Sequence, residues 1–419
     1  MIPDLVRDDK AVDDCEIMFS QISNIKKLFF LGIAVASTKV MLLLFAYFFN
    51  ADTYNQFNQF YYTASIVILF GSLGFNIAVT RIGITRRNVF AAVAVNTVIV
   101  YLVLQLISAT FDNALEIFAI VCYSIFISTA GIFIFQLLFA GRYKDYVLLT
   151  LLYSILHLIL IPAVIFFNID FFIALPLIGL LWFLSGLPRY IKVKESSHGS
   201  IKEFYKIGVS AFVINSAVSL ALAADKYFVN HFFSVDLANS YTFAWGLTAP
   251  MFYIGVIIEQ FLFSETRPSK SSILKKGFSL SASFVILYAT ALLIAVNFFP
   301  NLIPVSVNYN YVLNILTLMI TGYSVYVIFH FPVNAYLFKS LGTEKQKTIS
   351  IIFSIIIFVF VIVYIVIMQG VVTINYLWLV IITWSYIFTL LVTKILIMFR
   401  KTAEEEPITQ IPEITNLEP

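Results

Sequence analysis

The chain is built almost entirely from apolar segments, each about long enough to cross a bilayer, with short polar connections between them. A transmembrane helix needs about 20 consecutive, predominantly apolar residues. Of the 419 residues, 61% are hydrophobic and only 12% are charged, whereas soluble domains carry about 25% charged residues. We therefore expect an all-α, polytopic membrane protein with about twelve transmembrane helices. The candidate spans are 28–49, 61–83, 88–110, 115–139, 146–167, 171–190, 206–233, 238–263, 277–299, 309–337, 347–368 and 374–398.

Along the chain, connections between spans that contain Lys and Arg alternate with connections that contain neither. Those around Asp52 and Asp236, like the other odd-numbered ones, hold no Lys or Arg, whereas the even-numbered connections hold several each. Because cytoplasmic loops carry the excess of Lys and Arg, both termini are expected to be cytoplasmic. Lys394 is grouped here with Arg400 and Lys401, the basic residues that end the last span. Lys39 and Lys226 are exceptions, since both fall within spans.

The longest basic internal connection divides the twelve spans into two sets of six. We expect a cytoplasmic leader at 1–27, an N-terminal six-helix bundle at 28–190, a cytoplasmic linker at 191–205, a C-terminal six-helix bundle at 206–399 and a disordered cytoplasmic tail at 400–419. The leader lacks the basic start of a cleavable signal peptide. Transporters often consist of two such halves, with the binding site between them.

The seventh span carries an acid beside a base, Asp225 and Lys226. Ionisable groups at bilayer depth are costly, and they usually face a bundle interior or a water-filled cavity. At 100° per residue, one stripe of this helix collects polar and small side chains: Gly208, Asn215, Ser219, Lys226 and Asn230. The stripe predicts the wetted wall of a cavity. The alternative is a structural ion pair that locks the helix to a neighbour.

Lys39 lies near the middle of the first span, and Arg81 ends the second. With Lys226 they would form a cationic patch, which is suited to a pyrophosphate group. The alternative for Lys39 is pairing with a buried acid such as Asp225 or Glu259. Asn76, five residues before Arg81, is a further candidate for substrate binding.

Glu259, near the end of the eighth span, is a candidate for taking up H⁺ or Na⁺, or else a helix-end residue in the headgroup layer. His157 and His330 also lie within spans, where a histidine more often hydrogen-bonds between helices than relays protons. Gly71 and Gly74 are expected to let two helices approach closely.

Asp225-Lys226, followed by three apolar residues, a short turn and Tyr241 on the next helix, resembles a mid-chain pattern of bacterial polysaccharide flippases. The second span, a glycine-containing apolar helix that ends in Arg81, is similar to another pattern of that family. These O-antigen-type flippases belong to the multidrug/oligosaccharidyl-lipid/polysaccharide exporter superfamily. The resemblance implies a MATE-like fold and alternating access between two bundles, coupled to H⁺ or Na⁺.

The resemblance also implies a substrate, undecaprenyl-pyrophosphate-linked oligosaccharide, which would be flipped across the bacterial inner membrane for O-antigen, capsule or exopolysaccharide assembly. Expected partners are membrane lipids and other glycan-assembly membrane proteins, and no cofactor is expected. Asp225 and Glu259 are the predicted ion-coupling residues. The predicted substrate-binding residues are Lys39, Asn76, Arg81, Asn215, Lys226 and Asn230.

Two other functions stay open at this point. One is a drug or small-molecule exporter of the same superfamily, for which buried acids would suit the cavity better than buried lysines. The other is a membrane glycan polymerase or acyltransferase, although the short loops leave no room for a large extracytoplasmic domain. The sequence has no phosphate-binding glycine loop, metal-spaced His/Cys cluster or nucleophile motif. We therefore expect neither an enzyme nor a nucleic-acid-binding protein.

Overall fold

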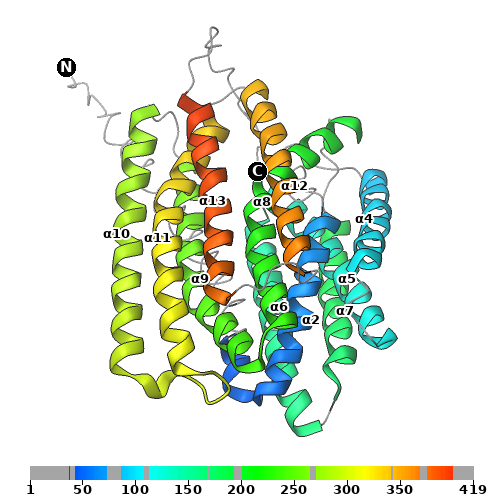
Figure 1. The fold of residues 1–419 in the computed structure, drawn as a ribbon. Helices are drawn as coiled ribbons and strands as arrows, with labels where there is room; N and C mark the ends of the chain where they lie inside the picture. Colours follow the sequence, from blue (N-terminus) through cyan, green and yellow to red (C-terminus); the bar gives the residue numbers. More distant parts are fainter. Residues whose placement is uncertain are drawn as a thin grey trace, which may run out of the picture.

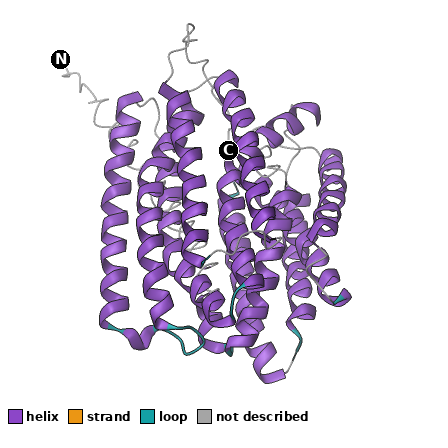
Figure 2. Cartoon of the chain, in the orientation of Figure 1, coloured by secondary structure: helices purple, strands orange, loops and turns teal. Residues whose placement is uncertain are grey.

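The computed structural model describes residue 37 and residues 43–72, 86–107, 113–140, 142–167, 169–192, 201–264, 270–340, 343–368 and 375–399. Within these ranges the regular structure is helical, and no strand occurs (Figure 2). The helices are α2 (Ala51–Ser72), α4 (Arg86–Ile107), α5 (Ala114–Phe139), α6 (Tyr143–Phe167), α7 (Phe171–Ile191), α8 (Ile201–Phe232), α9 (Val235–Ser264), α10 (Lys270–Phe298), η2 (Pro300–Leu302), α11 (Tyr309–Ser340), α12 (Thr343–Met368) and α13 (Tyr376–Phe399).

Each predicted span from the second to the twelfth overlaps one of these α-helices, so the all-α, membrane-spanning architecture is confirmed. Seven of the described helices, α5 to α7, α9 to α11 and α13, are long and apolar enough to cross a membrane. Large side chains such as Phe166, Leu287 and Phe358 are exposed on the outside of the bundle, as expected of a surface in contact with lipid. Most of the first predicted span lies outside the described residues.

Two helix boundaries differ from the predicted ones. Helix α2 begins at Ala51, ten residues before the predicted span, because its polar first turns pack against other helices and not against lipid. Asn55 and Asn58 are buried there. Helix α8 begins at Ile201, inside the stretch predicted to be a linker, and it buries Phe204 beside Phe133 and Tyr190.

The helices form two groups (Figure 1). In the first group α5 packs against α2, α4, α6 and α7; in the second, α11 packs against α9, α10 and α13, and α8 packs against α12 and α13. Helix α2 also contacts α8 and α9, which belong to the second group. This contact of α2 with α8 and α9 is called the seam below.

Gly71 allows α2 and α4 to approach closely, as predicted. A Cβ atom at position 71 would lie 2.4 Å from Asn96 Oδ1 and 2.6 Å from Val100 Cγ2. Both distances are far below van der Waals contact, so a larger residue would require the side chains of Asn96 and Val100, or α4 itself, to shift. Gly74 lies outside the described residues.

Candidate functional site

The buried acid and base of α8 lie at the seam. Lys226 Nζ is 2.9 Å from Asp225 Oδ1, and the two residues are 0% and 2% exposed. The same carboxylate oxygen accepts a hydrogen bond from the backbone N–H of Lys226 at 2.7 Å. The hydroxyl of Tyr241, on α9, donates to Asp225 Oδ2 at 2.6 Å, and Lys226 also donates to the Leu222 carbonyl. Each charge is thus balanced and hydrogen-bonded, as buried charges require.

Two aromatic rings lie close to the ammonium group of Lys226. Lys226 Nζ lies 4.3 Å from the ring centroid of Trp245 and 5.8 Å from that of Tyr62, within the range of a cation–π contact. Trp245 is on α9 and Tyr62 on α2, and their rings meet at 88° with centroids 6.0 Å apart. The indole N–H of Trp245 donates to the hydroxyl of Tyr323 on α11, at 2.6 Å. The ammonium therefore contacts both helix groups.

The ion pair is closed in this conformation. Lys226 and Asn230, which share the stripe predicted to line a wetted wall, are both buried. Lys226 is neutralised by Asp225, whereas the predicted cationic patch requires a free ammonium. In this conformation Lys226 has no exposed surface that an anion could reach.

The side of α2 that faces the seam is rich in amides. Asn55, Asn58, Gln59 and Tyr62 recur at helical spacing. Gln59 Nε2 donates to the backbone carbonyl of Asn230 at 2.7 Å and thus links α2 to α8. Asn55 Oδ1 and Asn58 Nδ2 are buried and have no hydrogen-bond partner, and the same is true of Asn230 Oδ1.

Asn230 donates to the carbonyl of Lys226 at 2.8 Å and to Thr242 Oγ1 at 3.1 Å. The structure therefore brings together three of the predicted site residues: Asp225, Lys226 and Asn230. Four further predicted site residues cannot be placed in this way. Lys39, Asn76 and Arg81 lie outside the described residues, and Asn215 lies on α8 but its side chain is not described.

A second hydrogen-bonded layer joins the helix groups where α8 ends and α9 begins, at the predicted extracytoplasmic end. Asn239 Nδ2 donates to the Ala51 carbonyl at 2.9 Å and to the Ser306 carbonyl at 3.3 Å. The Ser306 hydroxyl donates to the Ala46 carbonyl at 2.5 Å. These bonds close the seam at that end.

Glu259 is part of a separate cluster that ties α9, α11 and α13 together. Asn334 Nδ2 donates to Glu259 Oε1 at 2.6 Å, and Lys394 Nζ donates to Asn334 Oδ1 at 2.8 Å. Lys394 is 1% exposed. Lys394 lies near the end of α13, where the sequence analysis placed it, but it is not one of the exposed basic residues of that membrane face, because Asn334 holds its side chain inside the bundle.

His157 hydrogen-bonds between helices, as predicted. Its Nε2 lies 2.9 Å from the hydroxyl of Tyr123 on α5, and its Nδ1 lies 2.8 Å from the Tyr153 carbonyl. His330 is buried, and its ring stacks on Tyr326 with centroids 4.4 Å apart.

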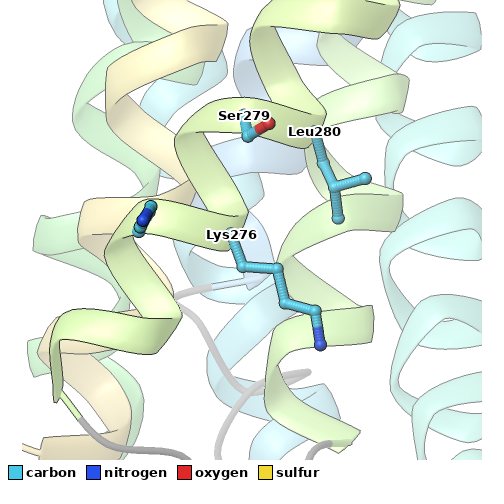
Figure 3. Close-up of a pocket in the computed structure, with 4 residues that line it drawn as sticks. Lys276, Ser279 and Leu280 are labelled. Atoms are coloured by element: carbon cyan, nitrogen blue, oxygen red, sulfur yellow. The ribbon is translucent and has the colours of Figure 1, made fainter.

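A shallow pocket lies on the surface of α10, away from the seam. Its lining residues Lys275, Lys276, Ser279 and Leu280 all belong to this one helix (Figure 3). Both lysines are exposed, as expected for the end of a span on the basic side. Throughout the described ranges, no group of three or more His, Cys, Asp or Glu is placed to hold a metal ion.

The sequence analysis did not recognise several residues of the seam and of the Glu259 cluster as buried partners. Lys394 is an ionisable residue within an apolar run and was detectable as such. Asn334 could not be singled out, because many other Asn and Gln residues of the chain also lie among apolar neighbours in the sequence. Tyr62, Trp245 and Tyr323 gave no signal, because 17% of the residues are aromatic and aromatic side chains are common in membrane helices.

The apolar helices, packed as two bundles around a buried polar seam, define a multi-pass, all-helical membrane protein. The fold is that of the MATE transporters of the MOP superfamily. An inward-facing multidrug resistance MATE family transporter of that superfamily matches with a TM-score of 0.56 and 13% identity, over 87% of this chain and 94% of that chain.

Two further solved structures agree. A MATE protein in complex with MaD5 has a TM-score of 0.54 and 12% identity, over 89% of this chain and 96% of that chain. The eukaryotic MATE transporter AtDTX14 has a TM-score of 0.52 and 13% identity, over 91% of this chain and 96% of that chain. No protein-family model and no curated protein matches the sequence. At these identities the likeness establishes the fold.

Proposed function

We propose that the protein is a MOP-superfamily transporter that moves an anionic, lipid-linked oligosaccharide from the inner to the outer leaflet of a bacterial inner membrane. Its place in the cell would be O-antigen, capsule or exopolysaccharide assembly. The MATE fold supports transport by alternating access. The polar groups of the seam support the choice of substrate class.

One observation carries the proposal: the seam holds buried amides with unused hydrogen-bonding atoms. Asn55 Oδ1, Asn58 Nδ2 and Asn230 Oδ1 are such atoms. Leaving a buried polar group unpaired costs about 1–3 kcal/mol, so a substrate that supplies partners would recover this energy. Sugar hydroxyls both donate and accept hydrogen bonds and would satisfy all three atoms.

The charge balance of the seam favours an anion over a cationic drug. Asp225 is already neutralised by Lys226, and the facing side of α2 presents amides and tyrosines. Opening the seam would expose an ammonium that a pyrophosphate can take over by charge-assisted hydrogen bonds. Asp225 would keep the hydroxyl of Tyr241 and the backbone N–H of Lys226 as donors.

The sharpest test replaces an amide that contributes little to stability. We expect Asn55→Leu to leave the amount of protein in the membrane and its thermal stability nearly unchanged, because Asn55 Oδ1 has no partner to lose. The same variant should fail to restore surface glycan in a strain that lacks its own oligosaccharide flippase. Asn297→Leu, on exposed α10, is the matched control and should export normally. Normal export by Asn55→Leu, Lys226→Ala and Lys39→Ala alike would end the proposal.

A second measurement separates the two exporter functions. Under this proposal the wild-type chain restores surface glycan and leaves the accumulation of a lipophilic cationic dye unchanged. The opposite pair of results would assign a drug exporter.

Ion coupling through Asp225 or Glu259 is part of the proposal and needs its own measurement. In proteoliposomes, lipid-linked oligosaccharide should move faster under a pH or Na⁺ gradient than without one. Asp225→Asn or Glu259→Gln should remove that dependence. A wild-type rate that responds to neither gradient would count against coupling.

A further inference from the structure

We infer that Asp225 and the aromatic side chains around it form a binding site for a small organic ammonium ion, and that Lys226 occupies this site as a tethered ligand. Its presence there keeps free organic cations out. The inference concerns the seam residues alone and does not rest on the nature of the transported substrate.

The composition of the site is that of an ammonium receptor. Recognition of organic ammonium ions relies on aromatic faces within about 6 Å of the charge, and Trp245 and Tyr62 lie at 4.3 and 5.8 Å. An acid supplies the countercharge, with Asp225 Oδ1 at 2.9 Å. The ammonium group in question belongs to the chain itself.

The walls of the site are held in place independently of Lys226. Asp225 is oriented by the hydroxyl of Tyr241, and Trp245 by its hydrogen bond to Tyr323. Tyr323 in turn packs edge-on against Trp384 of α13, with centroids 4.8 Å apart. Because these contacts come from α9, α11 and α13, we expect the acid and the rings to remain in position when the lysine side chain is shortened.

Lys226 thereby acts as a specificity-determining residue. While its ammonium fills the space between Asp225 and Trp245, an organic cation would have to displace a tethered group that is already charge-paired. Without the lysine, the same acid would lose its countercharge and the same rings would lose the cation beside them, so the site would attract a free cation. Residue 226 thus determines whether the seam accepts organic cations.

The test is chemical rescue. Lys226→Ala removes three methylene groups and the ammonium, which n-propylammonium replaces atom for atom. The full-length variant, purified in detergent, should unfold at a lower temperature than the wild type. Millimolar n-propylammonium chloride should raise its Tm by several degrees, by binding the folded state alone, and leave the wild-type Tm unchanged. Neutral n-propanol has the same size and should have no effect.

Two further variants make the result specific. Lys226→Met leaves no room for the amine, and Lys226→Ala/Asp225→Asn removes the countercharge, so neither should respond. If Lys226→Ala does not accumulate in the membrane, n-propylammonium in the growth medium should restore its yield where n-propanol does not. Equal effects of amine and alcohol, an equal response of the double variant, or no response in either stability or yield would overturn the inference. None of these outcomes bears on glycan export by the wild type.

Discussion

The geometry of the ion pair between Asp225 and Lys226 allows us to predict how much stability the protein loses when either partner is removed. With the charged atoms 2.9 Å apart and an effective dielectric constant of about 20, their attraction is about 6 kcal/mol. Removing one partner of a buried pair costs about 3–5 kcal/mol, because the other charge is left buried without compensation. We expect Asp225→Asn and Lys226→Met each to destabilise the protein by about 3 kcal/mol, the lower end of that range. The remaining contacts to Tyr241 or Trp245 account for the lower value.

The double variant Asp225→Asn/Lys226→Met carries no buried charge and should cost little more than either single variant. The resulting coupling energy is about 3 kcal/mol. To measure this coupling energy, the wild type, the two single variants and the double variant are each unfolded in mixed micelles with increasing amounts of denaturing detergent. The four free energies of unfolding form a double-mutant cycle.

A partly exposed pair in the same protein provides the control. Arg142 Nη2 lies 2.6 Å from Asp145 Oδ2, with side-chain exposures of 32% and 24%. The corresponding cycle should give less than about 1 kcal/mol, because solvent screens the pair. If the two seam variants were additive within about 0.5 kcal/mol, the argument that each charge depends on the other for its burial would be wrong.

Two further predictions concern helix packing. Gly71→Ala should destabilise the protein by about 1–3 kcal/mol, because its Cβ would overlap Asn96 and Val100. The control is Gly131→Ala, whose Cβ would meet nothing within 4 Å. This variant should be neutral or stabilising by up to about 1 kcal/mol. Equal thermal shifts for both alanines would contradict this. Asn334→Leu should cost about 3 kcal/mol, because it removes hydrogen bonds to both Glu259 and Lys394. Its control is Asn297→Leu on the exposed face of α10, and a loss no larger than that of the control would mean that the cluster does not hold α9, α11 and α13 together.

The positions of the helices follow from the sequence to a large extent, because a bilayer accepts few structures other than long apolar helices. The boundaries of α2 and α8 were harder to predict. Polar residues such as Asn55 end an apolar run in the sequence, although a helix continues through them wherever another helix covers them. The two-half division at residues 191–205 remains a prediction.

By itself, the sequence determined the class of the protein and pointed to Asp225 and Lys226, because an ionisable residue within an apolar span is visible without any knowledge of packing. Only the tertiary structure decided which side chains pair with these buried charged residues. Tyr62, Tyr241, Trp245 and Tyr323 come from three helices, and Lys394 is joined to Glu259 by an amide on a third helix. Such partners are selected by three-dimensional proximity, and the helical period of one segment carries no information about which face of another segment it will meet.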